Sequence, residues 1–161
     1  MRISSKLLSE IIRNVFNIPL NKKSSIIRVP KQIMYANEKI KTSFIQAYFD
    51  CDGFIANNER SIEFCTASKK FAEDFRNLLL GIDIYSTFSR KTIKQKYYYR
   101  IMVKSKDVEK FTQKIGSKIK FKHDRLELSN KIGIRQGFGK HELIPIGGLC
   151  KEVREYFGAT I

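Results

Sequence analysis

The sequence has few acidic residues and no long hydrophobic run, and both features limit the classes of function that it allows. Its 161 residues carry 16 Asp and Glu against 31 Lys and Arg, which gives a formal net charge of +15. A charge of this size favours a polyanionic partner, either nucleic acid or an anionic membrane surface, over a merely soluble basic protein. No run approaches the roughly 20 apolar residues of a membrane span, so we expect nucleic acid rather than a membrane.

Cysteine is scarce as well. Cys51, Cys65 and Cys150 are an odd, scattered set that forms neither a disulfide framework nor a zinc pattern. Such a set suits a reducing compartment, and the N-terminus lacks the basic-then-apolar pattern of a signal peptide, so we expect a cytoplasmic location. The length and the hydrophobic content of 42% predict one folded domain, residues 1–161, with a real core.

Residues 43–53 predict a helix that carries a row of small side chains. Ser43, Ala47 and Cys51 recur every four residues and therefore lie in one row. Small residues in a row let another backbone approach closely, so the row predicts a helix–helix contact. The side chains available for burial on a second face are Phe44, Tyr48 and Phe49.

This helix is predicted to stop on Asp50-Cys51-Asp52-Gly53. Gly53 fits the position after a helix end, where the left-handed backbone conformation costs little only for glycine. Two aspartates are unfavourable at the C-terminal end of a helix, because the helix dipole is already negative there. A bound cation would remove the repulsion, so the pair predicts either a cation site or a simple helix-stop turn.

Residues 45–53 resemble the signature of the LAGLIDADG homing endonucleases. The match is firm at the final Asp-x-Asp-Gly and at the small third position, whereas Gln46 and Tyr48 depart from the commonest pattern. The sequence has one copy of the signature, and the segments 2–8 and 29–33 are similar to those that precede it in intein-type members. The resemblance therefore implies an intein-type, single-motif member of this family.

The rest of the chain predicts an α+β fold. Helical and alternating patterns follow the order α-β-β-α-β-β-α, which is the core order of that family, with a four-stranded antiparallel sheet. The predicted parts are an N-terminal lead-in at 1–38, a core at 39–131 and a C-terminal extension at 132–161. In the lead-in we expect a helix capped by Ser4 or Ser5 and ended by Pro19, and a short helix at 31–35. In the first half of the core we expect the signature helix capped by Asn37, strands at 54–57 and 60–66, and a helix at 69–80 capped by Ser68. In its second half we expect strands at 82–89 and 97–103 around a basic tip at 90–96, a helix capped by Asp107 and ended by Gly116, and a helix at 122–131.

An antiparallel sheet with one basic, wet face is expected to contact DNA, because a two-stranded ribbon fits the major groove. For each single residue the alternative is a solvated strand face, and the basic tip as a group is the firmest expectation. The candidate DNA-binding residues are Asn57, Asn58, Arg60, Lys91, Lys94, Lys96, Tyr98 and Arg100, with Ser61, Glu63 and Thr87 as further polar candidates.

The resemblance also implies a metal-dependent catalytic centre. Asp52 is expected to bind Mg²⁺ (or Mn²⁺) with the backbone carbonyl of Cys51, while Asp50 is expected to hydrogen-bond the turn. A lysine near the metal, Lys122 or in second place Lys120, would polarise a water or stabilise the phosphate. The alternative for either lysine is an ordinary surface position.

One signature per chain predicts a homodimer, because one chain supplies one such carboxylate and a duplex has two strands. Ser43, Ala47 and Cys51 would form the dimer interface, unless the chain is half of a two-signature protein. We expect a site-specific homing endonuclease of intron or intein mobility that makes metal-dependent double-strand breaks in DNA, with no small-molecule substrate. The alternatives are a catalytically inactive DNA-binding regulator and an RNA maturase on the same fold. Met1 and Ile161 do not match self-splicing termini, so no splicing activity is expected.

Overall fold

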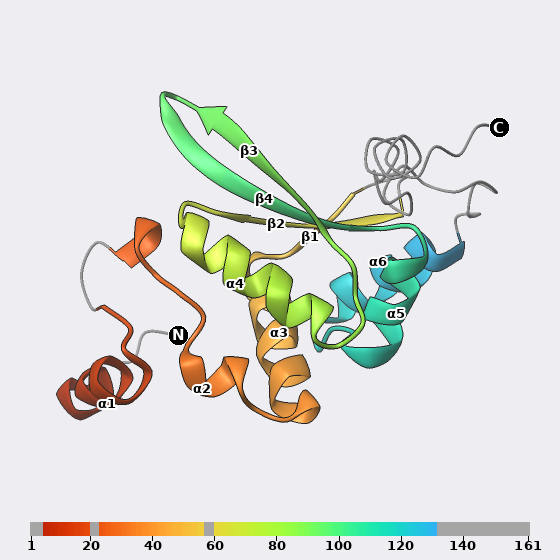
Figure 1. The fold of residues 1–161 in the computed structure, drawn as a ribbon. Helices are drawn as coiled ribbons and strands as arrows, with labels where there is room; N and C mark the ends of the chain where they lie inside the picture. The colour runs from red at the N-terminus through yellow and green to blue at the C-terminus, as the bar shows by residue number, and fades with distance from the viewer. Residues whose placement is uncertain (1–4, 20–22, 57–59, 132–161) are drawn as a thin grey trace, which may run out of the picture.

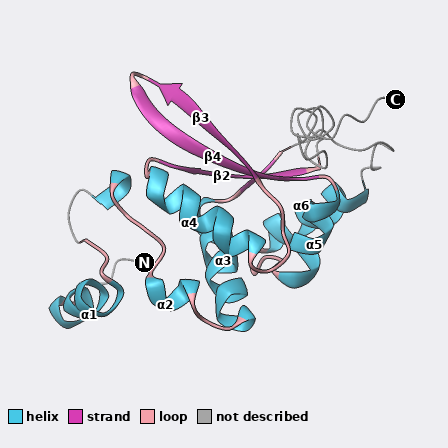
Figure 2. Cartoon of the chain, in the orientation of Figure 1, coloured by secondary structure: helices cyan, strands magenta, loops and turns pink. Residues whose placement is uncertain are grey.

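Helices cover one face of a four-stranded antiparallel sheet in the computed structural model, which describes residues 5–19, 23–56 and 60–131 (Figure 1). The strand order is β1-β2-β4-β3, and the helices gather on one side of the strands (Figure 2). This arrangement confirms the predicted α+β class and its core order. The elements are α1 (Lys6–Phe16), η1 (Lys23–Ser25), α2 (Lys31–Met34), α3 (Glu38–Asp52), β1 (Phe54–Ile55), β2 (Ser61–Thr66), α4 (Lys69–Leu80), β3 (Thr87–Ile93), β4 (Lys96–Lys104), α5 (Lys106–Lys114) and α6 (Lys120–Lys131).

The core lies between the sheet and the helices because alternate residues of the central strands point toward the helices. Ile62 and Phe64 of β2 pair with Val103 and Ile101 of β4, and all four side chains are fully buried. Phe49 of α3 lies with its ring centroid 6.0 Å from that of Phe64, in an edge-on arrangement. The alternation of apolar and polar residues along β2 and β4 therefore correctly predicts which side chains face the helices.

The predicted helix starts at Asn37 and Ser68 are confirmed. The Asn37 side chain accepts a hydrogen bond from the backbone N–H of Ile40 (3.0 Å), and the Ser68 hydroxyl accepts one from Phe71 (3.1 Å). The Ser68 hydroxyl also donates to the carbonyl of Ile27 (2.6 Å), which holds the lead-in segment against α4.

The first helix contributes nothing to this core. Ser5 caps it through the N–H of Leu8 (3.2 Å), as one of the two predicted caps. None of its residues is buried, and its apolar side chains Leu7, Ile11 and Val15 are exposed. Within the described ranges, no helix is both long enough and apolar enough to cross a membrane.

Gly53 is needed at the end of α3 for a different reason from the one predicted. Its backbone is extended (φ −74°, ψ 145°) and not left-handed, so the predicted conformation is wrong. A Cβ at this position would lie 2.2 Å from the Phe49 ring and 2.8 Å from the Phe49 carbonyl oxygen. Glycine is required because the chain passes directly over the Phe49 side chain as it leaves the helix.

The second hairpin begins later than predicted and has a tighter turn. Residues 82–86 form a connection after α4, where Asp83 has a positive φ of 64° and buried Ile82 and Ile84 mimic a strand pattern. Lys94 and Gln95 both have positive φ (47° and 61°), so they form the two-residue turn that matches the strand twist. Most of the predicted tip, residues 90–93, is therefore part of β3.

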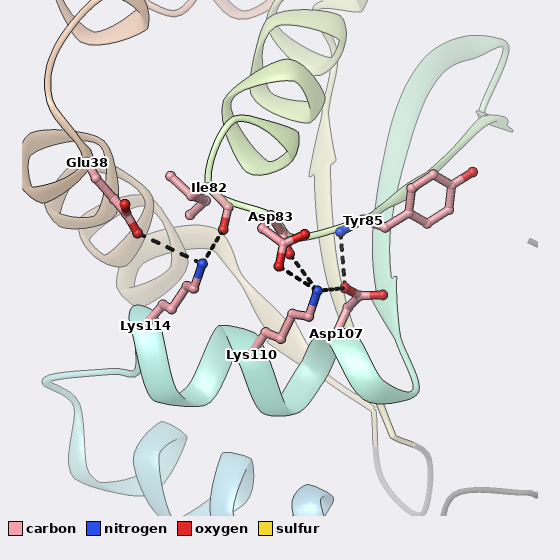
Figure 3. Close-up of polar contacts among 7 residues, drawn as sticks. All are labelled: Glu38, Ile82, Asp83, Tyr85, Asp107, Lys110 and Lys114. Carbon is pink, nitrogen blue, oxygen red and sulfur yellow. Dashed lines mark hydrogen bonds and ion pairs between the residues drawn. The ribbon is translucent and has the colours of Figure 1, made fainter. Parts of the chain in front are cut away.

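Asp107 holds the connection after α4 and does not cap α5. The cap position is Ser105, and the Asp107 carboxylate accepts a hydrogen bond from the N–H of Tyr85 (3.2 Å), as Figure 3 shows. Lys110 donates to the Asp83 carboxylate (2.7 Å), and this hydrogen bond and charge lower the pKa of Asp83. The last helix also starts earlier than predicted, at Lys120.

Replacing Gly53 by Ala should destabilise the fold by about 1–3 kcal/mol, because the added methyl overlaps the Phe49 ring and carbonyl. Gly81→Ala is the matched control, since its Cβ would come no closer than 3.3 Å to another atom and its φ is −65°. The control should change stability by less than about 1 kcal/mol. Equilibrium urea unfolding measures both, and equal stabilities would contradict this account of Gly53.

Candidate functional site

The C-terminal end of α3 is closed by the ammonium group of Lys122 from α6. Its Nζ donates to the carbonyl oxygens of Phe49 (2.6 Å), Asp50 (2.9 Å) and Gly53 (2.8 Å) and lies 5.1 Å from the centroid of the Phe49 ring. The residue is only 8% exposed. The last carbonyls of a helix lack intrahelical donors and carry the negative end of the dipole, so a buried cation here stabilises the helix end.

Two polar side chains of the signature fasten α3 to the segment that joins α5 and α6. Gln46 donates to the carbonyl of Ile115 (2.5 Å), just past the end of α5. The Asp50 carboxylate accepts hydrogen bonds from the Ser117 hydroxyl (2.5 Å) and the backbone N–H of Lys118 (3.2 Å). These contacts make both residues part of the support of the helix end.

Asp52 and Cys51 are exposed at this supported end. Within the described ranges, no hydrogen bond or ion pair engages the Asp52 carboxylate, and no donor engages the Cys51 carbonyl. Burial, and to a smaller extent the charge of Asp52, raises the pKa of the Tyr48 hydroxyl one turn back. A carboxylate and a carbonyl are oxygen ligands of the kind that Mg²⁺ prefers.

One chain offers only part of a coordination sphere. Across the described ranges, no group of three or more His, Cys, Asp or Glu side chains could hold a metal ion. The donors at the end of α3 fit a hard divalent cation in chemistry, but a single carboxylate is too few for a complete site.

The predicted row of small residues lies on the solvent-facing side of α3. Ser43, Ala47 and Cys51 are all exposed, whereas Ile45 and Phe49 on the opposite side are fully buried. Two exposed apolar side chains that the sequence patterns did not single out lie before and after this row along the chain, one in α3 and one in β1. These are Ile40 (46% exposed) and Phe54 (52% exposed).

The outer face of the sheet, opposite the helices, has a nearly neutral centre. Arg100 lies across from Cys65 on one side and Ser89 on the other, and its guanidinium pairs with the Glu63 carboxylate. Both side chains of this pair are partly exposed. Lys91, Lys94 and Lys96 lie farther out on the β3–β4 hairpin, which extends beyond the helices (Figure 1).

The predicted DNA-binding residues have different surroundings. Lys91, Lys94 and Lys96 are exposed on the hairpin, and Tyr98 and Arg100 are partly exposed on the outer face. Arg60 instead pairs with Glu109 of α5 (2.9 Å), and its side chain is 9% exposed, so its described contact is with the helix layer. Asn57 and Asn58 lie outside the described residues.

Comparison with known families identifies the domain. A family model for the LAGLIDADG-like domain matches residues 39–116, which run from the start of α3 to the end of α5. The chain therefore contains a LAGLIDADG-like domain, which confirms the family predicted from the signature.

Relatives of the chain are much longer proteins with unrelated names. This chain is 34% identical over 158 residues to a probable translation initiation factor IF-2 of Methanocaldococcus jannaschii. The aligned part is 95% of this chain and 13% of that protein. The chain is 30% identical over 157 residues to an A-type ATP synthase subunit of Pyrococcus abyssi, covering 98% and 13%. A replication factor C small subunit of M. jannaschii is 39% identical over 98 residues, covering 59% and 5%.

Asp50 and Asp52 should differ in their effect on stability. Asp50→Ala removes two hydrogen bonds to a charged group and should lower the free energy of unfolding by about 1.5–3 kcal/mol. Asp52→Ala should change it by no more than about 0.5 kcal/mol, or raise it, because a negative charge leaves the negative end of α3. Thermal unfolding of the two variants checks this, and a larger loss for Asp52→Ala would refute the assignment.

Proposed function

We propose that this chain is a DNA endonuclease of the homing type, which makes metal-dependent double-strand breaks at a specific site by phosphodiester hydrolysis. The observation that carries the proposal is the exposed carboxylate of Asp52 at a helix end where the neighbouring Asp50 carboxylate and the carbonyls of Phe49, Asp50 and Gly53 are engaged. The LAGLIDADG-like domain at residues 39–116 supports a nuclease-type fold.

Duplex DNA would bind along the outer face of the sheet. The exposed lysines of the β3–β4 hairpin suit phosphate contacts, which supply affinity but no sequence information. The neutral centre suits base contacts, and the Glu63–Arg100 pair holds one guanidinium in a fixed orientation there. An arginine so oriented can donate two hydrogen bonds to a guanine edge in the major groove.

Asp52 and the Cys51 carbonyl would hold the divalent metal, Mg²⁺ or Mn²⁺. When bound, such an ion supplies an activated water and neutralises charge on the phosphate. Lys118 and Lys120 are exposed on the segment that Asp50 fastens to the end of α3, so their ammonium groups are available to a nearby phosphate.

A second copy of the chain would complete the site. Two α3 helices packed through Ser43, Ala47 and Cys51 would bring two Asp52 carboxylates together, one for each strand of the duplex. The exposed apolar side chains of Ile40 and Phe54 extend the face that this contact would bury. The alternative is a second signature in a longer chain.

The relatives support an insertion-type origin, in an intein or an intron. Proteins named for translation initiation, ATP synthesis and a replication factor each contain a segment similar to this chain that covers 5–13% of their length, which favours an inserted segment over a part of one shared host function. A nuclease that promotes spread of its own coding sequence would be found in such unrelated hosts.

The decisive experiment incubates the protein and Mg²⁺ with a plasmid library of random targets. Asp52→Asn should reduce cleavage by on the order of 100-fold or more while DNA binding remains. Glu73→Gln, an exposed acidic position on α4, is the control and should cleave normally. Binding without cleavage at any target would favour the inactive regulator, and a preference for structured RNA would favour the maturase.

The dimer is tested by sedimentation of the protein with a bound duplex at micromolar concentration. We expect two chains per duplex, and Ala47→Arg should abolish this stoichiometry because a long charged side chain enters the row of small residues. Asn77→Arg places an arginine at an exposed position of α4 and should leave the stoichiometry of two chains per duplex unchanged. A complex of one unsubstituted chain per duplex would refute the dimer.

A further inference from the structure

We propose that Lys122 is a positioning residue for the metal-binding end of α3 and does not itself act on water or phosphate. The effect of Lys122 on cleavage rests on the proposed function, whereas its role as the cap of α3 follows from the contacts of this one side chain. It replaces the role in which Lys122 polarises a water, which was predicted from the family resemblance.

All the hydrogen-bonding capacity of the Lys122 ammonium is used inside the protein. An ammonium group has three N–H donors and no acceptor. Three carbonyl oxygens, those of Phe49, Asp50 and Gly53, lie 2.6, 2.9 and 2.8 Å from Nζ. Polarising a water or binding a phosphate would require the loss of at least one of these bonds in a largely buried position.

These three bonds fix the backbone on both sides of the proposed ligands. Asp50 precedes Cys51 and Gly53 follows Asp52, and the carbonyls of both flanking residues are held by the same nitrogen atom. The peptide groups of Cys51 and Asp52 are therefore confined between two anchored points. Their oxygens are the ones that remain available at this helix end within the described part of the chain.

The position of Lys122 is itself determined by the contacts of Asp50. The Asp50 carboxylate binds the hydroxyl of Ser117 and the N–H of Lys118, which places the start of α6 beside the end of α3. Lys122 lies in the first turn of α6, so its side chain reaches back across a short, fixed distance. Its positive charge also offsets the negative helix end that carries Asp52.

Nuclear magnetic resonance tests the capping contacts without DNA or metal. The Lys122 ¹⁵Nζ signal should show slow proton exchange with water and scalar couplings across hydrogen bonds to the carbonyl ¹³C nuclei of Phe49, Asp50 and Gly53. Lys131, exposed at the other end of α6, is the reference and should exchange rapidly. Rapid exchange and no such couplings for Lys122 would overturn the proposal.

Substitution tests the positioning role. Lys122→Met should lower the melting temperature, and at a temperature where it is still folded it should cleave about tenfold more slowly or worse, with unchanged DNA affinity. Lys122→Arg keeps a charge and several donors but cannot give up a proton, so it should recover most of the cleavage. Lys131→Met should match the unsubstituted protein.

Three outcomes would overturn the positioning role. They are a folded Lys122→Arg as inactive as Asp52→Asn, a folded Lys122→Met that cleaves normally, and a Lys122→Met that loses DNA affinity in proportion to cleavage. Absence of cleavage in the unsubstituted protein would instead count against the proposed function, and the carbonyl couplings would still decide whether Lys122 is the cap. The couplings also decide the matter if Lys122→Arg does not fold.

Discussion

The ammonium group of Lys122 determines how α3 ends, and the arrangement of the candidate site depends on that ending. A helix C-terminus presents unpaired carbonyls and a negative dipole, which disfavour both burial and nearby carboxylates. One buried cation, whose donors are all directed at the backbone, donates to three of the carbonyls at this end, of which that of Phe49 also accepts the backbone N–H of Gly53. The chain can then turn over the Phe49 ring at Gly53 and enter β1 directly.

Two aspartates two residues apart have opposite environments because of helix geometry. Each residue of a helix is rotated by about 100° from the one before, so Asp50 and Asp52 point to different sides. Asp50 faces the start of α6 and is bound by Ser117 and Lys118, whereas Asp52 faces solvent. The same geometry places Ala47 on the exposed side of α3 and Phe49 in the core, so one helix carries structural contacts, a candidate ligand and a candidate interface.

The fold was largely predictable because its signals are local. The caps at Asn37 and Ser68 and the alternation along β4 follow from short-range rules, and they are confirmed. The contacts of Lys122 and Gln46 were not predictable from local patterns, since each joins residues about 70 positions apart and a lysine in a lysine-rich chain gives no local signal. The family resemblance pointed to Lys122, but in a different role. Gly53 shows the same limit of local patterns. The sequence predicted that glycine matters at the end of α3, but glycine is required there because the Phe49 ring packs beneath the backbone.

The central claim is that the end of α3 presents Asp52 as a ligand for a divalent cation bound with DNA. Crystallography of the protein–duplex complex grown with Mn²⁺ tests this most directly, through an anomalous difference map. The account predicts a manganese peak in contact with the Asp52 carboxylate and the Cys51 carbonyl, beside a phosphate of the duplex. A map with no peak at Asp52, or with manganese held only by other residues, would contradict it.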